Sequence, residues 1–170
     1  MKDQILKELR QLITPRSQKE LLNCSYLKAG IPQSGITSVV GPGKTEFALK
    51  VISENLDFNV AWLEENFSIY PYAFLQKKVD LNRVLFVEAG RDFNWVTMQI
   101  LKAQVFRIVV AYGEEIDVRH LRRIQLACEK SHSAVIWLSN SDQSLWPVSL
   151  QLRTHKSSKG LEVEILKQRY

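Results

Sequence analysis

The sequence predicts an α/β fold, in which a mostly parallel, twisted sheet is flanked by helices. From residue 36 onward, short runs of β-branched and aliphatic residues alternate with helix-like segments, which is typical of a parallel sheet covered by helices. Residues 148–168 instead alternate with period two around Lys-Ser-Ser-Lys-Gly, which predicts an antiparallel hairpin at the sheet edge. The length of 170 residues, 45% of them hydrophobic, suffices for one core but not for two ordinary domains.

The predicted elements follow one another in a regular order. Strands are expected at residues 36–40, 59–65, 82–89, 106–112 and 133–139. Helices are expected at residues 45–55, 69–79, 96–103 and 118–130. Within the second of these segments, the helix itself is expected after Pro71, because proline suits the first turn of a helix.

An N-terminal segment, residues 1–26, precedes the predicted core domain of residues 27–170. Within residues 2–13 the apolar side chains recur at helical spacing, which predicts an amphipathic helix. Its apolar stripe consists of Ile5, Leu6, Leu9, Leu12 and Ile13. Pro15 follows, and the polar residues after it indicate a linker. The helix can pack against its own domain or join protomers into a homo-oligomer, and the sequence allows both.

Composition and charge exclude several classes of protein. Cys24 and Cys128 lie far apart without Cys-x-x-Cys spacing, which argues against a metal site or a disulfide framework and fits a reducing cytoplasm. The histidines show no ligand spacing, and no Gly-x-Ser-x-Gly motif is present. Charged residues interrupt the apolar N-terminal positions, so neither a signal peptide nor a membrane span is predicted there. The net charge of +5 favours an acidic partner without indicating nucleic-acid binding.

The stretch Gly-Pro-Gly-Lys-Thr at residues 41–45 has the context of a phosphate-binding loop. It lies between a predicted strand and a predicted helix, and it retains the Lys44 and Thr45 of such loops. A complete loop has four residues between its two glycines, because its backbone amides must surround the phosphates. Gly41 and Gly43 are present, but counting back from Gly43 places the first loop glycine at Ser38, within the predicted strand. Such a short turn can hold a lone anion but not enclose a triphosphate.

The order of these segments resembles bacterial RecA. In that family the loop reads Gly-Pro-Glu-Ser-Ser-Gly-Lys-Thr, and three of these residues are absent here. When the following segment is matched through Pro71, the catalytic glutamate of the family falls on Asn66, with Glu65 one residue away. The strand at residues 106–112 resembles the Walker B strand, and Ala111 takes the place of the aspartate that organises the Mg²⁺ shell.

This resemblance implies a RecA-like core that has lost the parts needed for ATP hydrolysis. Phosphoryl transfer depends on the phosphate-binding loop, on a carboxylate that holds Mg²⁺ and on a carboxylate that activates water, and all three are altered. A local slip of one residue would restore Glu65 to that last role. The junctions that hold the DNA-binding loops of RecA, after Tyr112 and after Asn140, are short. We therefore expect no ATP or Mg²⁺ cofactor and, at most, weak or indirect contact with DNA.

Among RecA-like proteins, the chain resembles the ImuA-type mutagenesis accessory proteins, a branch that lies near the SulA cell-division inhibitors. The likeness spans residues 27–169 and is carried by the helix at 118–130, the strand at 133–139 and the ending at 149–169, with its Leu-Lys-x-Arg pattern. Membership would imply a role in SOS-regulated translesion synthesis after DNA damage. The implied partners are an ImuB-like Y-family polymerase relative, an error-prone C-family polymerase complex and RecA itself.

Two further features are candidates for partner binding. The helix at residues 118–130 carries the cationic side chains Arg119, Arg122, Arg123 and Lys130, three of which lie near one side. They either grip an acidic partner or form an ordinary solvated face. Trp146 precedes Pro147 in a short loop, where an exposed tryptophan can anchor a protein contact. Further basic residues follow at 153–169, and their position relative to the helix depends on the fold.

These features predict an interaction protein, a non-catalytic RecA-like adaptor in the cytoplasm. Two alternatives stay open at this point. Lys44 and Thr45 could form a weak ATP-binding or ATPase module of the RecA family. The chain could also be a SulA-like inhibitor that caps a polymerising cell-division protein.

Overall fold

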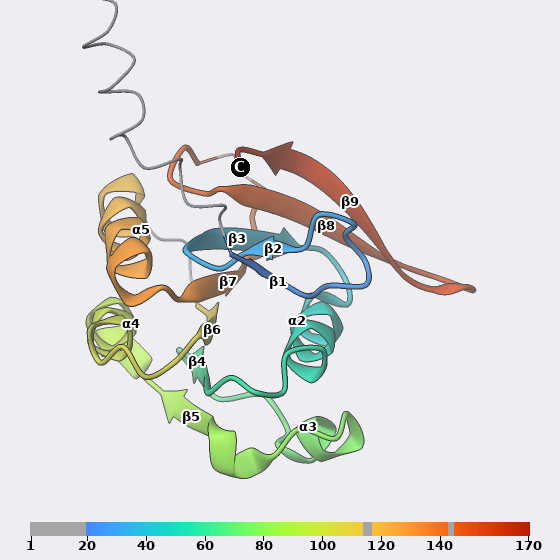
Figure 1. The fold of residues 1–170 in the computed structure, drawn as a ribbon, viewed down its shortest axis with the longest axis horizontal. Coiled ribbons are helices and arrows are strands. Elements are labelled where there is room, and N and C mark those ends of the chain that lie inside the picture. Colours follow the sequence, from blue (N-terminus) through green and yellow to red (C-terminus); the bar gives the residue numbers. More distant parts are fainter. Residues whose placement is uncertain (1–19, 114–116, 143–144) are drawn as a thin grey trace, which may run out of the picture.

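The computed structural model describes residues 20–113, 117–142 and 145–170, and its centre is a seven-stranded mixed sheet (Figure 1). The strands lie in the order β5-β4-β6-β7-β3-β8-β9, and all neighbours are parallel except the β8–β9 pair. Their bounds are β3 (Gly35–Val40), β4 (Val60–Glu64), β5 (Val84–Glu88), β6 (Ile108–Tyr112), β7 (Ala134–Leu138), β8 (Leu150–Ser157) and β9 (Gly160–Gln168). The predicted α/β class, with a C-terminal antiparallel hairpin, is confirmed.

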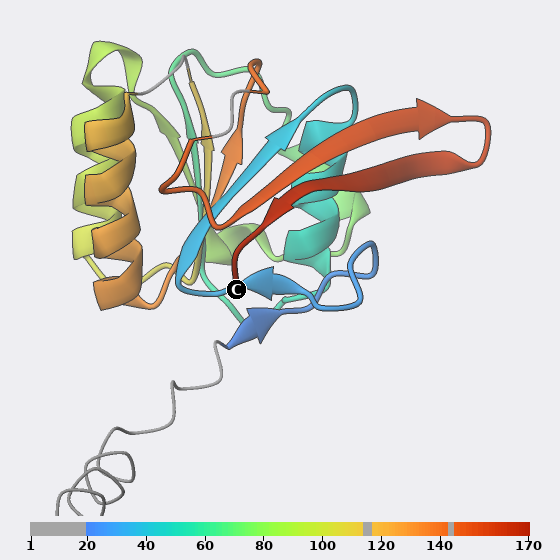
Figure 2. The same ribbon diagram turned by 90° about the horizontal axis from the view of Figure 1, so that it is seen from above.

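The helices follow the strands at the predicted positions and cover both faces of the sheet (Figures 1 and 2). The α-helices are α2 (Lys44–Ser53), α3 (Tyr72–Gln76), α4 (Phe93–Lys102) and α5 (Val118–Ser131). Short 3-10 turns, η1 (Leu81–Arg83) and η2 (Gly90–Asp92), precede β5 and α4. Local signals define the ends: α3 begins after Pro71, and the Asp117 carboxylate caps α5 by accepting from the amide of His120 over 2.9 Å.

The central strands β4, β6 and β7 are almost entirely apolar because they are covered on both faces. On one face, Trp62 of β4 packs edge-on against Phe74 of α3, in the cluster that also includes α2. On the other face, Trp137 of β7 packs edge-on against Phe93 of α4, in the cluster shared with α5. The sheet therefore separates two apolar clusters, and its carboxyl edge places the turns that follow β3, β4, β6 and β7 together.

Residues 20–26 contribute to the first of these clusters. Strand β1 (Leu21–Leu22) pairs antiparallel with β2 (Ile31–Pro32), a small two-stranded sheet that the sequence did not predict. Leu22 is buried, and the ring of Tyr26 stacks on Phe47 of α2 with 5.9 Å between centroids. The predicted amphipathic helix, with its stripe of Ile5, Leu6, Leu9 and Leu12, lies outside the described residues. Within the described residues, no helix is both long enough and apolar enough to cross a membrane.

Candidate functional site

The turn between β3 and α2 occupies the position of the phosphate-binding loop. β3 ends at Val40 and α2 begins at Lys44, so only residues 41–43 lie between them. Ser38, where the first loop glycine would fall, is buried within β3 and pairs with β7 on one side and β8 on the other. A turn of this length presents too few backbone amides to surround a polyphosphate.

The β8–β9 hairpin packs against this turn and accounts for both of its glycines. Gly41 and Gly43 have φ angles of 100° and 88°, in the region that favours glycine. A Cβ atom on Gly41 would clash with the carbonyl oxygen of Thr154, and one on Gly43 would clash with Leu161 Cδ1. The Thr154 hydroxyl also donates to the carbonyl oxygen of Val40 over 3.0 Å. Close approach of the chain to itself therefore requires these glycines, without any phosphate.

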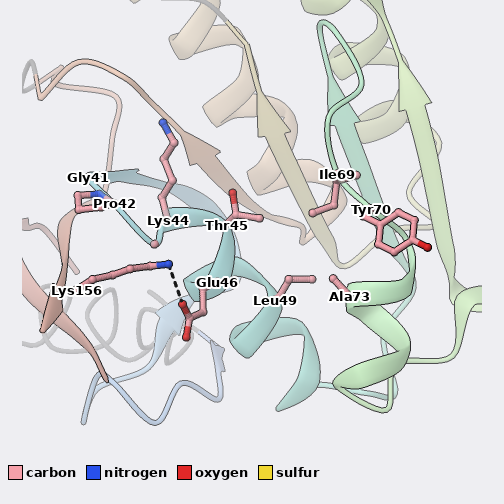
Figure 3. A pocket seen from close by; sticks show the side chains of 11 residues that line it. Gly41, Pro42, Lys44, Thr45, Glu46, Leu49, Ile69, Tyr70, Ala73 and Lys156 are labelled. Carbon is pink, nitrogen blue, oxygen red and sulfur yellow. Dashed lines mark ion pairs between the residues drawn. The ribbon is translucent and has the colours of Figure 1, made fainter. Parts of the chain in front are cut away.

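The amine of Lys44 is bound by the segments at the ends of β6 and β7. Its Nζ donates to the carbonyl oxygen of Ser139 over 3.0 Å and to Asn140 Oδ1 over 2.5 Å. The same atom lies 4.7 Å from the centre of the Tyr112 ring. Figure 3 shows the Lys44 side chain pointing away from the pair formed by Glu46 and Lys156. The lysine that would neutralise a phosphate therefore already has three partners in the protein.

Replacing Lys44 by alanine should lower the free energy of unfolding by about 1–2 kcal/mol, because a charged donor to two oxygens is lost. Urea denaturation monitored by circular dichroism measures this change. Lys28, which is exposed at another surface, provides the control: Lys28→Ala removes the same charge and should leave stability unchanged. Equal stability of the two variants would show that the protein does not hold the Lys44 amine.

A hollow of about 640 Å³ opens beside the turn, between α2, the segment that leads into α3, and β8 (Figure 3). Leu49, Ile69 and Tyr70 make much of its lining apolar. Within it, Lys156 Nζ lies 3.6 Å from the Glu46 carboxylate. Because Glu46 is in the first turn of α2, its carboxylate already complements the helix dipole and repels a phosphate. The hollow can hold a small ligand but is poorly suited to an anion.

The positions matched to the two carboxylates of the RecA reaction differ in burial and in whether they can ionise. Ala111 is fully buried in β6, within the apolar cluster beneath α4 and α5. Asn66 is exposed, and Glu65 is half-buried, with its amide donating to the carbonyl oxygen of Tyr112 over 3.1 Å. Alanine and asparagine cannot ionise, so of the three positions only Glu65 carries a carboxylate.

Glu64 is a buried carboxylate that the sequence reasoning missed. It ends β4 and is 1% exposed. One carboxylate oxygen accepts from Trp62 Nε1 over 2.8 Å, and the other accepts from the backbone amides of Ser68 and Ile69. Both oxygens are therefore engaged by the protein, and they anchor the segment that leads from β4 to α3. The one signal in the sequence is a glutamate at the end of an apolar strand.

The other chemistry-bearing side chains are dispersed or buried. Across residues 20–113, 117–142 and 145–170, no three His, Cys, Asp or Glu side chains gather as a metal site requires. Cys24 and Cys128 are free and buried, and this burial raises the pKa of both thiols. Thiols in such surroundings are unreactive, so neither is a candidate nucleophile.

Two of the predicted partner-binding residues, Arg122 and Trp146, lie in contact. The Arg122 guanidinium lies 5.3 Å from the centre of the Trp146 ring, which is 52% exposed. The end of β9 reaches the same loop: Lys167 Nζ donates to the carbonyl oxygen of Leu145 over 2.7 Å. Arg169 donates to the carbonyl oxygen of Trp146 over 3.4 Å. Helix α5 and the C-terminal end of the chain thus meet in one surface. We call this surface the Trp146 patch, and it is formed by Arg122, Trp146, Lys167 and Arg169.

The other predicted partner-binding residues lie elsewhere on α5. Arg119, Arg123 and Lys130 are all exposed. Arg123 and Lys130 line the space between α4 and α5, away from Trp146. In the Trp146 patch, burial and the neighbouring charge of Arg169 lower the pKa of Lys167. Two cations of β8, nearer the hairpin tip, form ion pairs instead. Arg153 pairs with Asp142 at 2.6 Å, and Lys156 pairs with Glu46.

The strand order, the turn after β3 and the terminal hairpin together define an α/β fold of the RecA-like type. Among solved structures, the chain is similar to the flagellar accessory protein FlaH from Methanocaldococcus jannaschii. The TM-score is 0.64, the sequence identity is 14%, and the match covers 88% of this chain and 89% of that chain. No family model and no curated protein matches the sequence. A likeness at this identity shows the fold alone, so function has to be argued from the site.

Proposed function

We propose that this protein is a non-catalytic RecA-like adaptor in SOS-regulated translesion DNA synthesis. It acts in the cytoplasm, where it binds an ImuB-like Y-family polymerase relative together with an error-prone C-family polymerase complex, and it contacts RecA. The resemblance of residues 118–130, 133–139 and 149–169 to ImuA-type proteins supports this role. The RecA-like fold is consistent with it but does not distinguish it from other functions of that fold.

One observation carries the non-catalytic part of the proposal. The groups that would hold ATP are engaged within the protein: the Lys44 amine binds Ser139 and Asn140, and the hairpin packs on Gly41 and Gly43. Binding a polyphosphate would require Lys44 to leave these partners and the hairpin to move. A fold whose nucleotide-binding groups are engaged in this way can still serve as a scaffold that binds other proteins.

The Trp146 patch supports the adaptor part. Tryptophan and arginine are enriched among the residues that dominate the binding energy of protein interfaces, and here an exposed tryptophan lies beside an arginine. The patch joins α5 to the end of β9, which belong to two of the three regions that carry the ImuA resemblance. We place the polymerase-associated partner on this surface.

The test is quantitative capture of partners by the tagged chain from DNA-damaged cells. The wild-type chain should recover the Y-family polymerase relative, and Trp146→Ala or Arg122→Glu should reduce its recovery by about tenfold, the effect of losing one interface hot spot. Lys28→Glu changes charge at a separate exposed site and should leave recovery unchanged. Equal recovery by all variants, or no polymerase in any sample, would contradict the proposal.

Thr45 follows Lys44 in the first turn of α2, as in a phosphate-binding loop, and this pair favours one second candidate, weak nucleotide binding. A hydroxyl at this position of a phosphate-binding loop coordinates Mg²⁺, so a nucleotide-dependent protein would fail without it. Damage-induced mutation frequency separates the two functions when Thr45→Ala is introduced at the natural locus. The adaptor proposal predicts a frequency equal to wild type, whereas a fall to the level of a deletion strain would favour the nucleotide-dependent function.

A further inference from the structure

A groove runs between α4 and α5, the two helices that cover one face of the sheet. The two helices lie side by side in both views (Figures 1 and 2). Two hollows, of about 530 and 280 Å³, open between them. Both are lined by Met98, Lys102 and Arg123, so they form one continuous depression, here called the α4–α5 groove.

The α4–α5 groove carries apolar side chains that the core of the domain does not fully bury. Ile100 and Leu101 of α4 and Ile124 of α5 already face the core. Trp95 nevertheless projects from α4 with 65% of its surface exposed, and Leu126 of α5 is 41% exposed. A large aromatic exposed beside a hollow is typical of a protein interaction site.

The rim of the groove is positively charged and largely uncompensated. Four cations line it: Arg91, Lys102, Arg123 and Lys130. None of the four forms an ion pair in the described parts of the chain. Among the described residues that line the groove, Asp92 is the one that carries a carboxylate, and His120 pairs with Asp117 at 3.0 Å. This contrasts with the hairpin, where Arg153 and Lys156 are both paired.

We infer that the α4–α5 groove binds an acidic amphipathic helix of a partner protein. The apolar face of such a helix would cover Trp95, Met98 and Leu126, and its carboxylates would pair with the rim cations. The ten residues of α4 span about 15 Å, which matches roughly three turns of a bound helix. The groove thus combines the two requirements of this binding mode, an apolar floor and opposite charge at the edge.

Two other occupants fit less well. A nucleic acid would use the cations for its phosphates and could stack a base on Trp95, but it would leave the exposed Leu126 uncovered. The predicted helix at residues 2–13 is slightly basic, since Lys2, Lys7 and Arg10 outnumber Asp3 and Glu8. Like charge therefore disfavours docking of this segment, whether from the same chain or from a second copy.

This inference deepens the proposed adaptor role and rests on that role for its biological use, because it states the chemistry of a partner segment. Its test does not depend on DNA repair. The probe is a fluorescein-labelled synthetic helix of about 16 residues, with leucine at three- and four-residue spacing and glutamate elsewhere. A scrambled peptide of equal composition and a second helix with lysine in place of glutamate are the comparison probes.

Fluorescence anisotropy with the full chain should show saturable binding of the acidic helix alone. Trp95→Ala should weaken it by about tenfold, and the double variant Lys102→Glu/Arg123→Glu by more than about tenfold. The matched control is Lys28→Glu/Lys159→Glu, an equal charge change at two other exposed positions, which should leave the affinity within about twofold. Urea denaturation of each variant confirms that the fold is retained.

Several outcomes would overturn the inference. These are equal binding of the scrambled peptide, an equal loss in the control double variant, or no saturable binding below about 1 mM. Displacement of the helix by an equal concentration of a single-stranded oligonucleotide would assign the groove to phosphates instead. Trp146→Ala should not affect this probe. Peptide binding that persists while polymerase capture fails would therefore refute the repair role and leave the groove assignment standing.

Discussion

Replacement of Gly41 by alanine should lower the free energy of unfolding by about 3 kcal/mol, one of the two largest effects expected for a single substitution here. Two costs combine. The φ angle of 100° is one that side-chain-bearing residues rarely adopt. In addition, the new methyl group would collide with the carbonyl oxygen of Thr154, which belongs to the backbone of β8 and cannot move without disturbing the sheet.

Gly160 separates these two costs. It has a φ angle of 114°, but a Cβ atom there would meet no atom within 4 Å. Gly160→Ala should therefore cost only the conformational part, about 1–2 kcal/mol. Equilibrium unfolding in urea compares the two variants. A loss at Gly41 no larger than the loss at Gly160 would mean that the hairpin does not press on the turn.

Replacement of Glu64 by alanine should destabilise the protein by a similar amount, about 3 kcal/mol or more. The substitution leaves the buried Trp62 indole N–H and the partly buried amides of Ser68 and Ile69 without their acceptor. Each buried donor left without an acceptor costs about 1–3 kcal/mol. Glu64→Gln retains one carbonyl oxygen but turns an NH₂ group toward other donors, so its stability should be intermediate.

Glu88 is the matched control for this prediction. It lies directly opposite Glu64 in the register of β4 and β5, but it is exposed and accepts one bond, from the amide of Phe67 over 3.0 Å. Water can replace that acceptor, so Glu88→Ala should change the free energy of unfolding by less than about 1 kcal/mol. Equal effects at the two positions would show that the carboxylate of Glu64 has no structural role.

Most of the fold could be predicted because its signals are local. The strand β6 is a short apolar run that is buried on both faces, and β8 and β9 alternate with period two around a glycine turn. Strand β1 was missed because two residues, Leu21 and Leu22, are too short for a periodic pattern. Their pairing depends on Ile31 and Pro32, which the chain brings back through a loop.

The candidate site could be predicted only in part, because its decisive contacts join distant residues. The spacing of Gly43, Lys44 and Ser38 indicated a shortened turn. It could not show that the Lys44 amine reaches Ser139, 95 residues away, or that Arg122 covers the ring of Trp146. The role of Glu64 depends on the path of the segment after β4, which no periodicity encodes.

We expect the turn after β3 to hold no nucleotide, and direct titration with a fluorescent ATP analogue in the presence of Mg²⁺ tests this expectation. The full-length chain should show no saturable binding below about 1 mM, and Lys44→Ala should behave in the same way. A micromolar affinity that requires Mg²⁺ and disappears in Lys44→Ala would contradict the account.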